Sequence, residues 1–150
     1  NWDDHAGNAG REGHFATFMR TRLPFLDQCL SALITDIYER NLDRKIMVCV
    51  VGEFGRTPKI RKGTPNNSVG RDHWPQAYTA LVSGGGMRMG QVIGATNSKG
   101  EYPTQRPTTP QDLLATIYHH LGINYRATIS DYFGRPVHIL PQGQPIGELL

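Results

Sequence analysis

The chain has 150 residues, a length that suits one domain with a substantial hydrophobic core. Its 16 lysines and arginines and 13 aspartates and glutamates leave a net charge of +3, too small an excess to indicate a nucleic-acid-binding protein. No apolar stretch approaches the roughly 20 residues that cross a bilayer, so the sequence predicts no membrane-spanning helix.

The N-terminal part of the chain reads NWDDHAGNAGREG, and its first residue is Asn1 rather than Met. We therefore expect the sequence to be part of a longer chain, and residues 1–13 to form a polar loop. Over residues 14–40, apolar side chains recur at spacings of three and four, which predicts an amphipathic helix or a pair of helices. Pro24 predicts a break or a restart within that stretch, and Asn41 predicts its end.

Two longer apolar segments follow the helical region. Residues 45–51, KIMVCVV, show no alternation of polar and apolar side chains, which predicts a strand covered on both faces, as in a parallel sheet. Residues 77–85, AYTALVSGG, predict a second buried strand that ends in glycines, and residues 89–96 predict a short third one. Residues 55–75, which separate the first two strands, predict a loop too long to be a simple connection.

The last clear helix is predicted from its terminal residues. Pro110 suits the first turn, Asp112 lies near the N-terminus and Gly122 marks the end. Residues 97–109 predict a loop before this helix, and residues 137–140 predict a short strand after it. Helix, buried strand, loop, strand and helix in this order are typical of an α/β fold.

The strongest candidate site begins at Glu53, directly after the first predicted strand. Ligands of open α/β sheets bind beyond the carboxyl ends of the strands, where this carboxylate would lie. The cations between Glu53 and Asp72 are Arg56, Lys59, Arg61, Lys62 and Arg71, with no acidic residue among them. Such a loop can attract and clamp phosphate or sulfate oxygens. The alternative is a solvated loop in which Glu53 pairs with Arg56 or Arg71.

Two Asp–His sets accompany this carboxylate. Asp72 and His73 lie side by side after the basic loop, and Asp3 and His5 lie near the start of the chain. Carboxylates and imidazoles together suit Zn²⁺, Mn²⁺ or a similar divalent cation. Either set alone also occurs in ordinary turns, so the two sets flanking a carboxylate at the end of a strand make the stronger case.

Other patterns favour structural roles. The glycines 84–86 lack the Lys-Ser/Thr ending of a P-loop, which favours a tight turn with positive φ over a phosphate cradle. His119 and His120 lie in the last turn of a helix, where they can cap carbonyls. Only Trp74 and Tyr78 lie near enough to the basic loop to stack on bases, so we expect no nucleic-acid partner.

Several motifs, in this order, resemble one family. The segments GEFGRTP, GRDHWP, LVSGGGMRMGQVIGAT, TPQDLLATIYHHLGI and GRPV resemble domain-of-unknown-function family 1501, which consists of bacterial, sulfatase-like proteins of the alkaline phosphatase superfamily. The opening Trp-Asp-Asp-His segment is similar to that family's Trp-Asp-x-His. The resemblance implies that residues 1–150 are the C-terminal portion of one alkaline-phosphatase-like domain, a three-layer α/β/α sandwich. It also implies export to the periplasm or the extracellular space.

The resemblance further implies a divalent metal, which could be Zn, Mn, Ca or Mg. The positions carried over as its ligands are Asp3, His5, Glu53, Asp72 and His73. Related sulfatases carry an Asp-His pair where this chain has Glu53 and Phe54, so one histidine ligand of the usual two-metal arrangement is missing. The nucleophile is expected in upstream sequence outside this chain.

Two functions are consistent with these expectations. The first is a metal-dependent hydrolase of small or glycan-linked phosphate or sulfate esters, in which Arg56 and Arg71 neutralise charge that develops on the ester oxygens. The alternative is a non-catalytic protein of the same fold that binds an anionic glycan or a partner protein. The replacement of a histidine by Phe54 favours the alternative.

Overall fold

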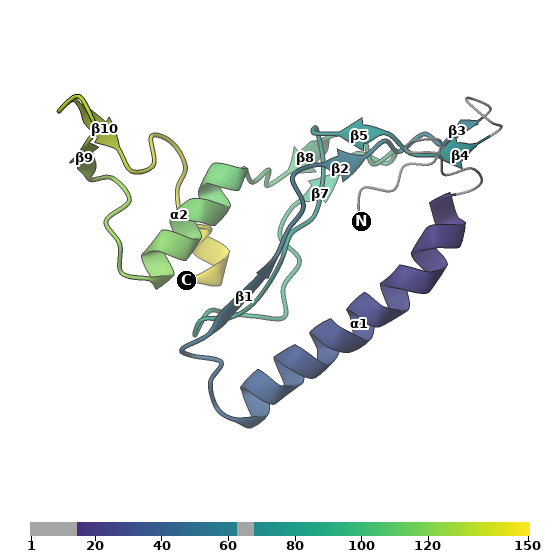
Figure 1. Ribbon diagram of the computed structural model, residues 1–150, viewed down its shortest axis with the longest axis horizontal. Coiled ribbons are helices and arrows are strands. Elements are labelled where there is room, and N and C mark those ends of the chain that lie inside the picture. The colour runs from purple at the N-terminus through teal and green to yellow at the C-terminus, as the bar shows by residue number, and fades with distance from the viewer. Residues whose placement is uncertain (1–14, 63–67) are drawn as a thin grey trace.

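A computed structural model of the protein describes residues 15–62 and 68–150 (Figure 1). Within these ranges two α-helices and one short 3₁₀ helix accompany five two-stranded antiparallel sheets. The α/β class is confirmed in this general sense of mixed helices and strands, and the three-layer sandwich stays a prediction. No helix in the described part of the chain is both long and apolar enough to cross a membrane.

The predicted N-terminal helix is α1, Phe15–Glu39, and it is a single helix of 25 residues. Pro24 lies inside it, so the expected break is wrong: one lost hydrogen bond does not end a long helix whose other turns propagate cooperatively. The predicted end is confirmed, because Asn41 has a positive φ of 57°. The Leu42 N–H donates to Ile37 O at 2.9 Å, which closes the left-handed helix end typical of a Schellman motif.

The two predicted buried strands pair with each other. Strand β1, Met47–Val50, lies antiparallel to β6, Leu81–Gly84, with Met47 opposite Gly84. The expectation of a parallel sheet is therefore wrong, and all four residues of β1 are half-buried rather than buried. A parallel pair needs a crossover, usually a helix, whereas the described residues between these strands form short strands and turns.

The glycines at the end of β6 form the tight turn that the sequence predicts. Gly84, Gly85 and Gly86 have φ values of 81°, 69° and 68°, in the left-handed region that glycine adopts without strain. The Gly85 N–H donates to Ile46 O at 2.8 Å, so the turn is bonded to the residue before β1. A Cβ on Gly84 would lie 2.3 Å from that same carbonyl oxygen, which explains why a residue without a side chain stands there.

The long loop predicted between β1 and β6 contains four short strands. Strand β2, Gly55–Arg56, pairs with β5, His73–Trp74, and β3, Arg61–Lys62, pairs with β4, Val69–Gly70. We call residues 55–62 and 68–74 the basic arm. In Figure 1 the arm continues from β1, and β3 and β4 lie at the opposite end of the molecule from β9 and β10.

The C-terminal half carries the remaining elements. They are β7 (Ala95–Thr96), β8 (Pro103–Gln105), α2 (Pro110–His120), β9 (Thr128–Ser130), β10 (Pro136–His138) and the 3₁₀ helix η1 (Gly147–Leu149). The predicted start of α2 is confirmed, because Thr109 and Asp112 form a reciprocal capping box and Pro110 occupies the first turn. Such a cap stabilises a helix by about 1 kcal/mol.

The small core lies between α2 and the C-terminal segment. Ala115 and Thr116 are fully buried, and Ile146 and Leu149 are nearly so. The Thr116 hydroxyl donates to Asp112 O at 2.7 Å and accepts from the Ile146 N–H at 2.9 Å. Because this buried hydroxyl both donates and accepts a hydrogen bond, it holds the C-terminal segment against α2.

Candidate functional site

The basic arm brings the two most specific motifs of the sequence together. Its β2–β5 pairing places Gly55 opposite Trp74 and Arg56 opposite His73. Beyond these pairs, Thr57 N–H donates to Asp72 O at 2.9 Å, and Asp72 N–H donates to Thr57 Oγ1 at 3.1 Å. GEFGRTP and GRDHWP therefore form one structural unit, in which the Thr57 side chain organises the backbone.

Arg71 holds the two strands of this unit in register. Its Nε donates to Thr57 O at 2.6 Å and its Nη2 donates to Arg56 O at 3.1 Å. From the sequence this guanidinium is expected either to neutralise substrate charge or to pair with Glu53, and in the structure it also makes these two bonds to backbone carbonyls. Arginine has five N–H donors, so two such bonds leave donors for an anion.

The Asp72 carboxylate is held by a cation from β3. Arg61 Nε lies 3.2 Å from Asp72 Oδ1 and 3.1 Å from Oδ2. Both side chains remain partly exposed, 31% for Arg61 and 47% for Asp72, so solvent weakens the pair. A modest ion pair of this kind orients the carboxylate and still allows a more highly charged cation to compete for it.

The His73 imidazole packs against the aromatic ring that follows Glu53. The ring centroids of Phe54 and His73 lie 4.0 Å apart at an interplanar angle of 31°. The Arg56 guanidinium carbon lies 5.9 Å from the Phe54 centroid, within the range of a cation–π contact. Glu53 itself is exposed. The Phe54 ring thus contacts both the imidazole of His73 and the guanidinium of Arg56.

Only some of the predicted metal ligands lie in the part of the chain that the structure describes. Glu53, Asp72 and His73 come from the two paired segments, whereas Asp3 and His5 lie outside the described residues. Within residues 15–62 and 68–150, no three His, Cys, Asp or Glu side chains are grouped closely enough to hold a metal ion. The donor types fit a divalent cation, and the five-residue ligand set stays a prediction.

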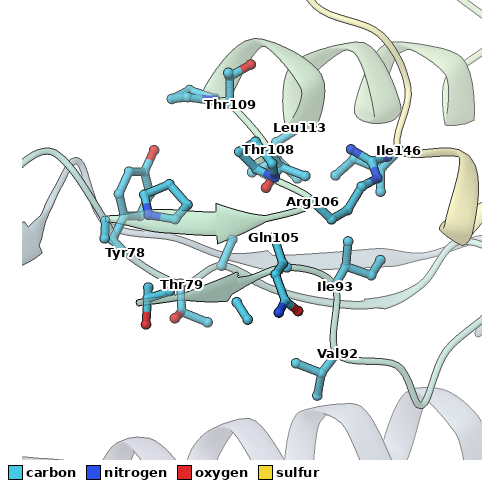
Figure 2. A pocket seen from close by; sticks show the side chains of 18 of the residues that line it. Tyr78, Thr79, Val92, Ile93, Gln105, Arg106, Thr108, Thr109, Leu113 and Ile146 are labelled. Carbon is cyan, nitrogen blue, oxygen red and sulfur yellow. The ribbon is translucent and has the colours of Figure 1, made fainter. Parts of the chain in front are cut away.

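A cleft of about 790 Å³, which the sequence did not predict, begins immediately after the arm (Figure 2). Its lining comes from residues 75–80, 82, 91–96, 103, 105–110, 113, 146 and 149. Figure 2 shows Leu113 of α2 and Thr109, the residue before that helix, on one side of the cleft and Tyr78, Thr79 and Gln105 on the other. Because these segments are far apart in the chain and share no short motif, no local sequence signal points to the cleft.

The one charged side chain in the cleft lining is paired. Arg106 donates to Glu148 through Nε at 2.5 Å and through Nη2 at 2.7 Å, a two-point ion pair. The hydrogen bond to Glu148 raises the pKa of Arg106, and the same bond lowers the pKa of Glu148. Arg106 has a positive φ of 44°, an unusual backbone conformation that accompanies this contact.

The partial positive charge at the N-terminus of α2 is also neutralised, in this case by the carboxylate of Asp112. Asp112 Oδ2 accepts from the backbone N–H of Thr109 at 2.8 Å, and Asp112 Oδ1 accepts from Gln144 N–H at 2.9 Å. Burial raises the pKa of Asp112, but these backbone bonds, the Thr109 hydroxyl and Arg106 outweigh it, so the pKa is lowered. The carboxylate therefore stays ionised at the positive end of the helix dipole.

One comparison with known proteins gives a match. The sequence profile of a family described as "Protein of unknown function (DUF1501)" matches residues 1–150. The match includes both the basic arm and the cleft. No curated protein and no solved structure is detectably similar to the chain.

Proposed function

Because this chain belongs to the DUF1501 family, whose description assigns no activity, we propose a function from the chain's own residues: metal-dependent hydrolysis of phosphate or sulfate esters. The observation that supports this proposal most strongly is the β2–β5 pairing, which joins the segment after Glu53 to Asp72 and His73. A carboxylate, an imidazole and several cations on adjacent strands are suited to binding a metal ion and an anionic ester together.

The candidate site residues, in and near the arm, have distinct proposed roles. Glu53, Asp72 and His73, with Asp3 and His5, would hold a divalent cation. Such a cation polarises an ester oxygen and lowers the pKa of a coordinated nucleophile. Arg61 orients the Asp72 carboxylate, as the contacts at 3.1 and 3.2 Å show.

The arginines of the arm would bind the ester group. Arg56 and Arg71 would neutralise charge that develops on its oxygens during hydrolysis. Arg71 also keeps Arg56 in place through its bond to the Arg56 carbonyl. The nucleophile itself is expected outside these 150 residues.

The wider proposal places the arm in an alkaline-phosphatase-like, sulfatase-like α/β/α sandwich in an exported protein. The exposed apolar side chains of α1 support a further layer, because a helix in such a sandwich covers a sheet. Leu23, Phe25 and Leu33 are 51%, 65% and 49% exposed, and apolar surface of this kind usually packs against a partner.

Removal of metal is expected to abolish ester hydrolysis. After dialysis of the full-length protein, which includes the expected upstream nucleophile, against a chelator, turnover of 4-nitrophenyl phosphate or 4-nitrophenyl sulfate should fall at least about 100-fold, since a bound cation supplies several kcal/mol of transition-state stabilisation. Addition of Zn²⁺ or Mn²⁺ should restore it. Hydrolysis that survives chelation, or that no divalent cation restores, would contradict the proposal.

A second candidate is a non-catalytic protein that uses the same arm to bind an anionic glycan or a partner protein. Two contacts favour it: Asp72 is already paired with Arg61, and His73 packs on Phe54. This candidate predicts salt-sensitive retention of a sulfated polysaccharide with no turnover of either aryl ester at any metal concentration.

A further inference from the structure

We propose that the cleft beyond the basic arm binds a short neutral oligosaccharide, the sugar portion of a glycan-linked ester whose charged group lies at the arm. The inference rests on the proposed function, which it extends by naming the substrate class. It starts from the continuity of the two features. His73 and Trp74 form β5, and Pro75, the next residue, is the first residue of the cleft lining.

The junction between the arm and the cleft is held by Trp74. Its indole Nε1–H donates to Glu101 O at 2.7 Å, and its ring lies 5.7 Å from the ring of Tyr102. Strand β8, whose residues Pro103 and Gln105 line the cleft, follows directly. Trp74 therefore joins β5 of the arm to the segment before β8, which lines the cleft.

The charges around the cleft favour a neutral ligand over an anionic one. Arg106 is neutralised by Glu148 through two hydrogen bonds. The positive end of α2 is neutralised by the Asp112 carboxylate, which accepts from the Thr109 backbone N–H. Both features that could attract an anion are compensated, in contrast to the arm, where cations outnumber carboxylates.

The lining chemistry matches sugar hydroxyls. Among the described residues, the side chains of Gln76, Gln105 and Thr108 make no hydrogen bond within the protein, and all three line the cleft. An amide offers donors and an acceptor, and a hydroxyl offers both, which suits a polyhydroxylated ligand. A strongly apolar ligand would leave these groups unpaired.

The apolar part of the cleft suits the C–H face of a sugar ring. Tyr78 is 37% exposed at the cleft, and Val82, Ile93 and Leu113 contribute aliphatic surface. Figure 2 shows Tyr78 and Gln105 on the side of the cleft opposite α2, and the phenol ring offers a packing face there. The volume of about 790 Å³ falls within the range of small-molecule sites.

The test measures saccharide binding rather than hydrolysis. Saturation-transfer NMR of the protein with cellotriose, maltotriose and triacetylchitotriose is expected to show contact with at least one trisaccharide. Tyr78→Ala should weaken that binding about 10-fold by loss of the packing surface, and Gln105→Ala about 3- to 10-fold by loss of a hydrogen bond. Tyr132→Ala, at a tyrosine that is 96% exposed on the β9–β10 turn, is the matched control and should bind as the wild type does.

Three results would overturn the inference. They are the absence of contact with all three trisaccharides, equal binding by Tyr78→Ala and Tyr132→Ala, and binding in the cleft of an uncharged peptide or of dextran sulfate alone. The Gln105→Ala variant keeps the test valid if Tyr78→Ala does not fold. Aryl-ester turnover is measured separately, so loss of saccharide binding with hydrolysis intact rejects the cleft alone, and the reverse rejects the hydrolase alone.

Discussion

Replacing Gly55 with alanine is expected to lower the free energy of unfolding by about 3 kcal/mol, a large effect for the addition of one methyl group. A Cβ at this position would lie 2.0 Å from Ala77 O and 3.1 Å from Tyr78 Cβ. The obstructing atom is backbone, so it cannot move without separating β2 from β5, where Gly55 lies opposite Trp74. Urea denaturation measures the change in the free energy of unfolding.

The matched control is the other glycine of the same motif. A Cβ on Gly52 would meet Phe54 O at 3.5 Å, an ordinary contact, and Gly52 needs no positive φ. Gly52→Ala should therefore change the free energy of unfolding by less than about 1 kcal/mol. Equal unfolding curves for the two variants would show that the β2–β5 pairing does not form as described.

Replacing Glu53 with glutamine in the full-length protein is expected to weaken Zn²⁺ binding about 100-fold and to lower ester turnover by at least as much. Loss of a residue that only supports a metal ligand already costs 10- to 100-fold in affinity, so the loss of a ligand charge should reach the upper part of that range. The side chains are nearly isosteric, and Glu53 is exposed, so the substitution should leave the fold intact. Isothermal titration with Zn²⁺ measures the affinity.

Glu39→Gln controls for the loss of one negative charge. Glu39 is an exposed glutamate at the end of α1, and its substitution should leave both Zn²⁺ affinity and turnover unchanged. If the Glu53 and Glu39 variants bind Zn²⁺ as tightly as the wild type, Glu53 is not a ligand and the non-catalytic alternative gains support.

The helix boundaries could be predicted from the sequence because their signals are local. Thr109, Pro110 and Asp112 satisfy the first turn of α2 within four residues of chain, and Gly122, with a φ of 69°, ends it. Asn41 ends α1 in the same local manner. Pro24 misled the prediction, because a proline's cost is local whereas the stability of a 25-residue helix is distributed along its length.

Strand pairing could not be predicted to the same degree, because a partner is chosen by distant residues. The apolar run at 45–51 gives a strand in either orientation, and only the course of the chain to residue 81 makes β1 and β6 antiparallel. The short strands of the arm are even less visible. A two-residue strand has no period to detect.

The sequence was enough to predict which residues make up the candidate site, but not which contacts their side chains make. The order of residues indicated that Glu53 and the Asp72–His73 pair belong together, and the β2–β5 pairing joins their segments. The bond of Arg71 to two carbonyls and the stacking of Phe54 on His73 depend on rotamers and register, which no motif encodes. The cleft was missed because its glutamines and threonines have no characteristic spacing.

The central claim is that Glu53, Asp72 and His73 share one divalent cation with Asp3 and His5. A crystal structure of the protein soaked with Zn²⁺, measured at the zinc absorption edge, locates the metal directly by anomalous scattering. The account predicts a single strong peak within bonding distance of Glu53 and of Asp72 or His73. An anomalous map without a peak at the arm, or with zinc bound only elsewhere, would contradict it.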